Sequence, residues 1–204
     1  MATINPKLSI ILGSQSPRRR ELMAGLDVPF TAITIDSKES YPSDLRAGDI
    51  PIYISREKAE AYLPRLRENN LLITADTIVW LNGQMLGKPH DLEDARRMLH
   101  ALSGETHQVY TGVTFTYLQD GKPTMQSLVD CTDVTFRELT DEEINFYVGK
   151  YKPLDKAGAY GIQEYIGYIG VSNMVGSYFN VMGFPVEKVY SVLKLFGREI
   201  SHPK

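Results

Sequence analysis

The order of hydrophobic and polar positions along the chain predicts strands and helices that alternate. Short apolar runs and stretches in which every second position is apolar are typical of strands, and apolar positions three or four residues apart are typical of helices. Strands are predicted at residues 8–12, 71–75, 78–81, 84–86, 109–117 and 124–136. Helices are predicted at residues 17–25, 51–63, 91–102, 140–149 and 185–196. We therefore expect an α/β fold with a mixed sheet flanked by helices.

Turn and capping residues support several of these boundaries. Ser16-Pro17 is a typical start of a helix, because serine caps it and proline suits its first position. Asn82-Gly83 predicts a tight hairpin turn, and Asp120-Gly121 joins two long strands. The segment 140–143 reads Thr-Asp-Glu-Glu, a capping box. The glycine-rich segment 158–183 gives no clear pattern.

Composition narrows the class of protein. The 204 residues suit one domain, or two small lobes around a shared core. The net charge of -3 gives no general attraction to nucleic acid, so an anion site has to be built locally. A lone cysteine, Cys131, excludes an intrachain disulfide. No apolar run reaches membrane length, and we expect a cytoplasmic protein that binds neither membrane nor nucleic acid.

A basic turn follows the first predicted strand. Residues 13–20 read Gly-Ser-Gln-Ser-Pro-Arg-Arg-Arg, which places three arginines at the positive end of a helix dipole. That arrangement is unfavourable unless an anion lies nearby. Backbone N–H groups and the hydroxyls of Ser14 and Ser16 would complete a phosphate site at this strand-to-helix junction. The alternative is a solvated basic turn with an ordinary helix cap.

Asp76 directly follows the predicted strand 71–75. Strand ends in α/β sheets often open onto a ligand crevice, where an acid can hold a metal or activate water. The alternative is an aspartate that only caps the next turn. Lys58 and Lys88 have no role on their own, because an isolated lysine is usually a surface residue.

Six short motifs together resemble the Maf family of nucleotide pyrophosphatases. Five of them lie at residues 14–19 (Ser-Gln-Ser-Pro-Arg-Arg), 57–59 (Glu-Lys-Ala), 75–77 (Ala-Asp-Thr), 87–89 (Gly-Lys-Pro) and 157–163 (Ala-Gly-Ala-Tyr-Gly-Ile-Gln). Residues 176–185 resemble the closing motif of the family. Each motif alone is weakly specific, but their common order covers about residues 8–196.

The resemblance implies that residues 1–204 form a single Maf-like domain, whose two lobes surround one active cleft. The fold would be related to inosine-triphosphate pyrophosphatases. The implied reaction converts a nucleoside triphosphate to the monophosphate and pyrophosphate. Arg19, Lys58 and Lys88 would hold the polyphosphate, with hydrogen bonds from Ser14. Asp76 would be the general base or a metal ligand, and the sequence leaves both roles open. The family also implies a homodimer.

The implied cofactor is a divalent cation, Mg²⁺ or Mn²⁺. Maf-like proteins usually carry two successive acids in the loop after the first helix, but here that loop reads Asp36-Ser-Lys-Glu39. Either acid can fill the role, and we expect Glu39. Magnesium is usually bound by one or two carboxylates with waters and phosphate oxygens, so Glu39 and Asp76 would suffice.

Three positions indicate the base. The branch that resembles dTTP/UTP pyrophosphatases carries Arg, Thr and Gln where this chain has Arg18, Thr77 and Gln163. The sister branch that acts on 7-methyl-GTP carries Trp, Gln and Glu. A glutamine offers one acceptor and one donor, which match N3–H and a carbonyl of uracil or thymine. Because the amide can turn over, Gln163 alone does not exclude CTP.

Two alternative functions are compatible with the same motifs. One is the same chemistry on 7-methyl-GTP or on modified pyrimidine triphosphates. The other is a non-catalytic nucleotide-binding regulator, because Maf-like proteins have been associated with restraint of septum formation. The set of candidate catalytic residues favours the enzyme.

Overall fold

The computed structural model describes residues 8–37 and 40–199, and it contains a mixed seven-stranded sheet. The strand order is β2-β1-β3-β5-β6-β7, and β4 pairs with β3. β1 runs parallel to β2 and β3, whereas the other neighbouring strands are antiparallel. The strands are β1 (Ser9–Gly13), β2 (Phe30–Ile33), β3 (Asn70–Leu81), β4 (Gln84–Leu86), β5 (Thr106–Gln119), β6 (Lys122–Phe136) and β7 (Val171–Val175). The predicted α/β class with a mixed sheet is confirmed.

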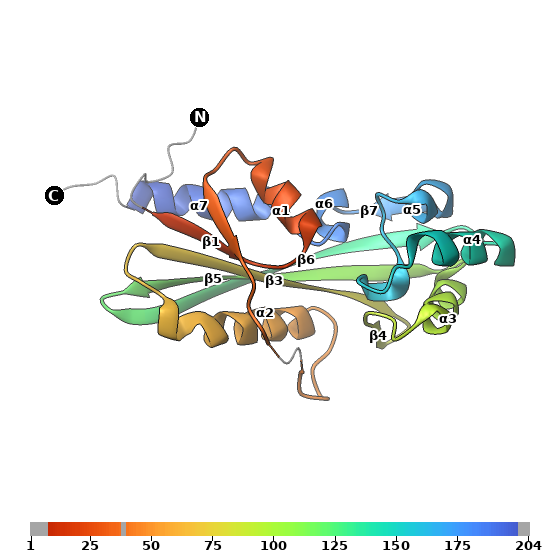
Figure 1. Ribbon diagram of the computed structural model, residues 1–204, viewed down its shortest axis with the longest axis horizontal. Helices are drawn as coiled ribbons and strands as arrows, with labels where there is room; N and C mark the ends of the chain where they lie inside the picture. The colour runs from red at the N-terminus through yellow and green to blue at the C-terminus, as the bar shows by residue number, and fades with distance from the viewer. Residues whose placement is uncertain (1–7, 38–39, 200–204) are drawn as a thin grey trace.

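Helices cover both faces of this sheet (Figure 1). Met23 of α1 and Leu193 of α7 pack with Leu12 on one face, while Ile54 of α2 packs with Ile78 on the other. The helices are α1 (Pro17–Ala24), α2 (Asp49–Tyr62), η1 (Leu63–Arg65), α3 (Leu92–Leu102), α4 (Asp141–Tyr151), η2 (Ala157–Ala159), α5 (Tyr165–Gly170), α6 (Tyr178–Val181) and α7 (Val186–Glu199). Within the described residues, no helix combines the length and apolar character needed to cross a membrane.

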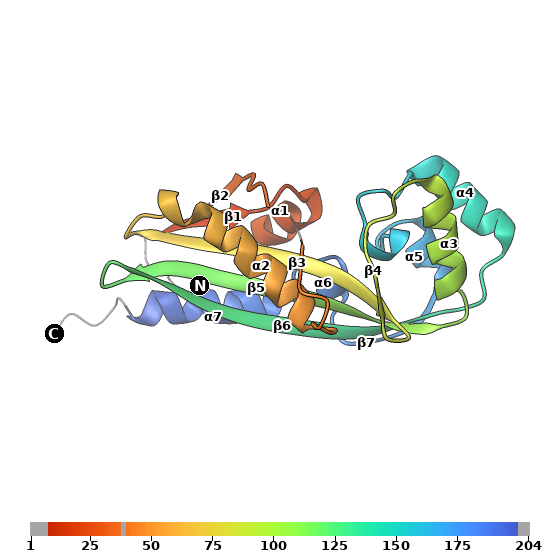
Figure 2. The ribbon, with the colours of Figure 1, turned by 90° about the horizontal axis from the view of Figure 1, so that it is seen from below.

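A second lobe is built on the far ends of the long strands. Leu99 of α3, Tyr147 of α4 and Ile166 of α5 form one apolar cluster with Leu81 and Phe136 of the sheet. Figure 2 shows this group of helices separated from α1, α2 and α7, with β3, β5 and β6 running between the two groups. The strands shared by both lobes fix the relative position of the residues that face the space between them.

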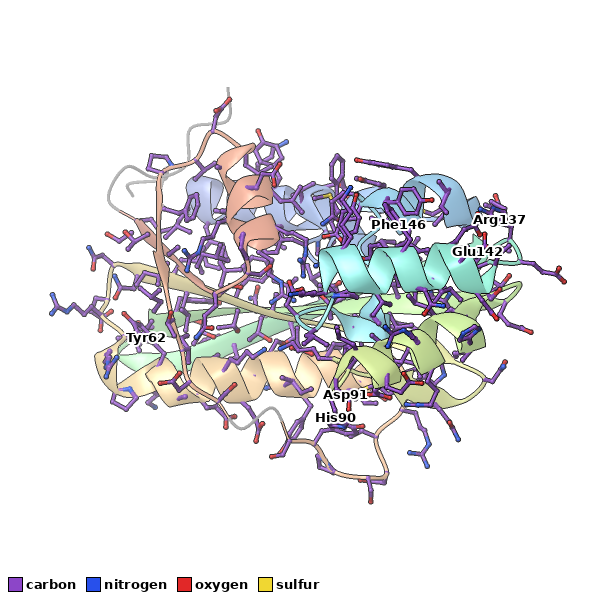
Figure 3. The ribbon with its side chains drawn as sticks, turned by 45° about the vertical axis from the view of Figure 1, so that its right-hand side comes forward. Tyr62, His90, Asp91, Arg137, Glu142 and Phe146 are labelled. Atoms are coloured by element: carbon purple, nitrogen blue, oxygen red, sulfur yellow. The ribbon has the colours of Figure 1, made fainter. Side chains whose placement is uncertain are left out.

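The predicted capping box sets the start of α4. The Thr140 hydroxyl accepts the Glu143 N–H at 3.2 Å, and the Glu143 carboxylate accepts the Thr140 N–H at 2.9 Å. Arg137 donates to Glu143 Oε1 at 2.7 Å. Figure 3 shows Arg137 and Glu142 at this end of the helix, with Phe146 further along it.

The structure corrects one predicted boundary and adds elements that the sequence did not predict. The predicted strands at 71–75 and 78–81 are one continuous strand, β3, because β5 pairs with residues 72–80 without a break. β2 was not predicted, and the glycine-rich segment contains the short elements α5, β7 and α6. The predicted tight turn is confirmed, since Asn82 and Gly83 both have positive φ angles, 49° and 82°.

The edge of β3 that faces β1 is interrupted. β1 pairs with β3 as far as Thr74, and β4 begins to pair with it at Val79. Along that edge, residues 75–78 of β3 therefore lie between the two partner strands and are paired with neither of them. This interruption places the polar pair Asp76 and Thr77 at an open sheet edge between the lobes.

His107 on β5 makes stability dependent on pH. It is fully buried, and its Nε2 lies 2.7 Å from the Tyr160 hydroxyl, while Nδ1 has no partner among the described residues. Burial lowers the pKa of His107 to about 4, although Asp133 acts in the opposite direction. The folded state therefore binds fewer protons than the unfolded chain, whose histidine pKa is about 6.5.

We expect this difference to destabilise the fold as pH falls from 7 to 4. The contribution of neutral His107 to the free energy of unfolding is fully present above the unfolded pKa. It is lost as the pH falls towards the folded pKa, and the loss amounts to about 3 kcal/mol. Urea unfolding of the wild-type protein and of His107→Gln between pH 4 and pH 7 measures this change in the free energy of unfolding. The pH dependence should be weaker in the variant, and equal pH slopes for the two proteins would contradict the assignment.

Candidate active site

A cleft of about 470 Å³ lies at the interrupted edge of β3. Its walls come from the turn after β1, from α2, from β3 and from the segment between α4 and α5. Sequence-predicted residues that line it are Ser14, Ser16, Arg18, Arg19, Lys58, Asp76, Thr77, Lys88 and Gln163. These residues come from five separate parts of the sequence, at positions 14–19, 58, 76–77, 88 and 163, and the fold brings them to one cavity.

The turn after β1 has the predicted cap geometry. The Ser14 hydroxyl accepts the N–H of Ser16 at 3.2 Å, and the Ser16 hydroxyl accepts the N–H of Arg19 at 3.5 Å. Pro17 takes the first helical position of α1. The parallel pairing of β1 with β3 places this turn beside the residues that follow Thr74, because Gly13 and Thr74 are partners in the register.

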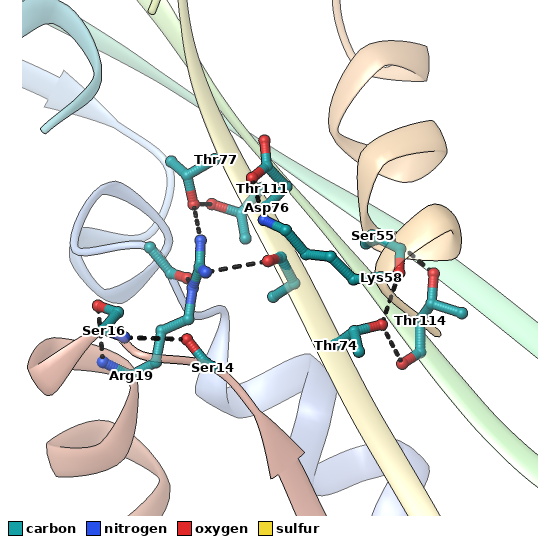
Figure 4. Close-up of polar contacts among 12 residues, drawn as sticks. Ser14, Ser16, Arg19, Ser55, Lys58, Thr74, Asp76, Thr77, Thr111 and Thr114 are labelled. Carbon is teal, nitrogen blue, oxygen red and sulfur yellow. Dashed lines mark hydrogen bonds and ion pairs between the residues drawn. The ribbon is translucent and has the colours of Figure 1, made fainter. Parts of the chain in front are cut away.

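Arg19 ties this turn to β3 and to the segment before α7. Its guanidinium donates to the carbonyl oxygen of Gly183 at 2.7 Å, to that of Ala75 at 2.9 Å and to the Thr77 hydroxyl at 2.9 Å. The Ala75 carbonyl lies on the interrupted edge of β3. The guanidinium thus holds together three segments that line the cleft (Figure 4).

The other two arginines of the basic turn have different partners. Arg18 lies 3.0 Å from Asp155 in the second lobe, which makes an ion pair between the two sides of the cleft. Arg20 turns back and donates to the Ser14 carbonyl at 3.2 and 3.3 Å. Only Arg18 and Arg19 line the cleft, so the three arginines do not converge on one point.

Asp76 and Lys58 form an ion pair inside the cleft. The Lys58 Nζ donates to Asp76 Oδ1 at 2.7 Å, and the two side chains are only 10% and 14% exposed. Asp76 points to the α2 face of β3, whereas Thr77 points to the face of α1, because successive side chains of a strand alternate. The contact with Lys58 is made by Oδ1 of the carboxylate.

A network of hydroxyls fixes α2 and therefore Lys58 (Figure 4). The Thr74 hydroxyl donates to the Ser55 carbonyl at 2.7 Å, and the Ser55 and Thr114 hydroxyls lie 2.7 Å apart. Ser55 precedes Lys58 by three residues, so both lie on the same side of the helix. Gly112 is the register partner of Asp76, and a Cβ atom there would lie 2.6 Å from the Pro51 carbonyl oxygen. Close helix–strand contact thus sets the Lys58–Asp76 distance.

Thr77 connects β3 to the segment before α7. Its hydroxyl lies 3.0 Å from that of Thr111, and Thr111 donates to the Asn180 carbonyl at 3.0 Å. Asn180 is fully buried, and its side-chain amide donates to the Val109 carbonyl at 3.0 Å. The closing glycine-rich motif therefore supports one wall of the cleft.

Gln163 and Lys88 lie in the second lobe. Oε1 of Gln163 is buried and has no hydrogen-bond partner among the described residues. A buried acceptor without a partner is costly, so this oxygen is positioned for a donor that a ligand would bring. Lys88 is exposed and follows β4.

The predicted acids are only partly within the described residues. Asp36 lines the cleft, whereas Glu39 lies outside the described residues. In the part of the chain that the structure describes, no three His, Cys, Asp or Glu side chains gather as a metal site. Asp76 and Asp36 are the described carboxylates on the side of the cleft formed by the first lobe.

Sequence reasoning missed two charged residues of the cleft. Asp155 and Lys156 both line it, and Lys156 is only 8% exposed. They directly precede the motif at residues 157–163, but nothing local marks a lysine as buried. Arg18, the partner of Asp155, is 137 residues away, and Glu164, the partner of Lys156, follows the motif directly.

The chain is similar over most of its length to proteins of known name. A dTTP/UTP pyrophosphatase of Bacteroides thetaiotaomicron is 54% identical over 189 residues, which cover 92% of this chain and 96% of the relative. One of Phocaeicola vulgatus is 53% identical with the same coverage. One of Flavobacterium psychrophilum is 47% identical over 90% of this chain and 92% of its own. The model of the family described as Maf-like protein matches residues 9–196, and the chain therefore belongs to that family.

Proposed function

We propose that this protein is a nucleoside triphosphate pyrophosphatase that hydrolyses dTTP and UTP to the monophosphate and pyrophosphate. The observation that carries the proposal is the Lys58–Asp76 pair at an interrupted sheet edge, in the same cleft as the basic turn and Gln163. The relatives named dTTP/UTP pyrophosphatases support the choice of substrate. The expected role is removal of unwanted nucleotides from the cellular pool.

The reaction is an in-line attack of water on the α-phosphorus. Asp76 accepts a proton from the water through its carboxylate or holds the metal, and these two roles remain alternatives. The new bond joins the water oxygen to the α-phosphorus, and the bond from that phosphorus to the bridging oxygen breaks. Pyrophosphate leaves with the electron pair, so the site has to neutralise negative charge on the leaving group.

Basic residues from both lobes supply that charge. Lys58, Lys88 and Arg19 are proposed to bind the polyphosphate, with the Ser14 and Ser16 hydroxyls and the adjacent backbone as further donors. Arg19 also makes three hydrogen bonds to protein acceptors, which hold its guanidinium in a fixed orientation. A fixed guanidinium loses little conformational entropy when it binds a phosphate.

We infer that a divalent cation would be held jointly by the site and the substrate. Mg²⁺ and Mn²⁺ prefer oxygen ligands, and Mg²⁺ commonly takes one or two carboxylates together with phosphate oxygens and waters. Asp76, which lines the cleft and accepts a hydrogen bond from Lys58 at its Oδ1, is one such carboxylate. Glu39 or Asp36 is the proposed second acid. When bound, the cation would neutralise charge on the phosphates.

Base recognition is assigned to Arg18, Thr77 and Gln163. The unpartnered Oε1 of Gln163 suits the N3–H of uracil or thymine, and its NH₂ group suits the neighbouring carbonyl. Thr77 acts by fixing Arg19 and the wall of the cleft. We further propose a single Maf-like domain that works in the cytoplasm as a homodimer and has no nucleic-acid partner.

A nucleotide panel tests the proposal directly. Purified protein is incubated with Mg²⁺ or Mn²⁺ and dTTP, UTP, CTP, 7-methyl-GTP or ITP, and pyrophosphate release is quantified. Fast release from dTTP and UTP is expected. Faster release from 7-methyl-GTP would support the pyrophosphatase reaction but would overturn the assignment of a pyrimidine base. Binding of nucleotides without release of pyrophosphate would instead favour the non-catalytic regulator.

A further inference from the structure

Lys156 is a buried cation between two carboxylates. It lies in the segment between α4 and η2, and its Nζ is 2.8 Å from Asp155 Oδ1 and 3.1 Å from Glu164 Oε1. Because an ammonium is costly to remove from water, a lysine that is 8% exposed needs such partners. The two carboxylates therefore hold its side chain in one place at the wall of the cleft.

One branch of this network leads to the backbone that carries Gln163. The Tyr147 hydroxyl donates to Glu164 Oε2 at 2.5 Å and accepts the Gly161 N–H at 3.1 Å. The Glu164 N–H donates to the Gly161 carbonyl at 3.0 Å. A Cβ atom at Gly161 would lie 3.1 Å from Cε of Lys156, so the lysine packs directly over this backbone. Lys156 and Glu164 together fix the segment on either side of Gly161.

The other branch crosses the cleft. Asp155 directs its Oδ2 to Arg18 Nη1 at 3.0 Å, while its Oδ1 faces Lys156. Partial burial acts to raise the pKa of the Asp155 carboxyl, but hydrogen bonds from Lys156 and Arg18 bring that pKa below its ordinary value. Asp155 is therefore ionised at neutral pH and joins Lys156 to the N-terminal end of α1.

We propose that Lys156 is a positioning residue that sets base selectivity in this cleft. Through Glu164 it holds the segment of Gln163, and through Asp155 it holds Arg18, so both base-reading side chains depend on one cation. The proposal rests on the proposed function, because it assigns a role within the same nucleotide site. The Lys58–Asp76 pair belongs to a different set of contacts on the α2 face of β3.

The first test compares UTP with CTP in Lys156→Met. Loosening of the segment lets the Gln163 amide turn over, and the reversed amide matches cytosine. The ratio of kcat/KM for UTP to that for CTP should fall about tenfold, mainly through a higher KM for UTP, the size expected for one lost hydrogen bond. Lys156→Arg should restore most of the ratio, because arginine can also bridge two carboxylates. Lys122→Met is the matched control at an exposed position on β6.

Hydrogen exchange of the ligand-free protein provides a readout that does not depend on turnover. Lys156→Met should speed exchange of the amides at residues 157–164 at least several-fold, with little change in β3. An equal loss of kcat for both nucleotides, or unchanged exchange at 157–164, would overturn the positioning role. If wild-type protein released no pyrophosphate, the proposed function would fail separately, and the exchange data would still decide whether Lys156 orders this segment.

Discussion

Asp76→Asn is expected to lower kcat for UTP by about 10³-fold or more, with the Kd for UTP changed only a few-fold. Loss of a general base costs about 10²- to 10⁴-fold, and loss of a metal ligand acts in the same direction. Affinity is retained because binding depends on the basic residues of the cleft. Single-turnover pyrophosphate release and equilibrium titration with UTP measure the two quantities separately.

The variant should also remain folded. The asparagine Oδ1 can accept the hydrogen bond that Lys58 gives to Asp76 at 2.7 Å in the wild-type protein. Asp44→Asn makes the same chemical change at an exposed position in the loop before α2 and should leave kcat unchanged. Undiminished turnover by folded Asp76→Asn would remove Asp76 from the chemistry and assign the catalytic step to other residues of the cleft.

Much of the fold could be predicted because local signals agree with the tertiary structure. Ser16-Pro17 starts α1, the capping box at Thr140 starts α4, and Asn82-Gly83 makes the turn between β3 and β4. Each signal acts within a few residues, where backbone dihedral angles and caps decide the outcome. β2 gave no such signal, because its four residues are only half-buried or exposed at the sheet edge.

The position of Asp76 illustrates where local reasoning is incomplete. The polar pair 76–77 interrupts an apolar pattern, which predicted a strand end at residue 75. The strand in fact continues, and the interruption lies in the pairing of its edge, where β1 has ended and β4 has not begun. The sequence thus indicated the place where the cleft opens, but not the reason for it.

The charged residues of the cleft find their partners far away in the sequence. Arg18 meets Asp155, 137 residues away, and Arg19 meets the Gly183 carbonyl, 164 residues away. A run of arginines predicts an anion, but a carboxylate or a carbonyl oxygen satisfies a guanidinium equally well. The same limit explains why Lys156 was missed, since its burial follows only from the packing of the second lobe.

Gln163→Glu should lower kcat/KM for UTP and dTTP by about 10²-fold and shift the preference towards 7-methyl-GTP. The substitution replaces the amide donor by a second acceptor, which then faces a carbonyl oxygen of the pyrimidine. A site built to hydrogen-bond its substrate discriminates strongly when that pairing is lost. In contrast, a carboxylate matches the N–H donors on a guanine edge. Initial rates with UTP, dTTP and 7-methyl-GTP measure the shift.

Glutamate at position 163 also brings a charge close to Glu164, so a general loss of activity has to be separated from a change in base preference. Gln163→Met provides that separation, because it keeps the length of the side chain and removes both hydrogen bonds without adding charge. This variant should have a lower kcat/KM for UTP and dTTP and an unchanged kcat/KM for 7-methyl-GTP. If both variants kept the wild-type order of substrates, Gln163 would not contact the base. Its buried Oε1 would then require a donor from the protein or from water, because a buried acceptor is rarely left unpaired.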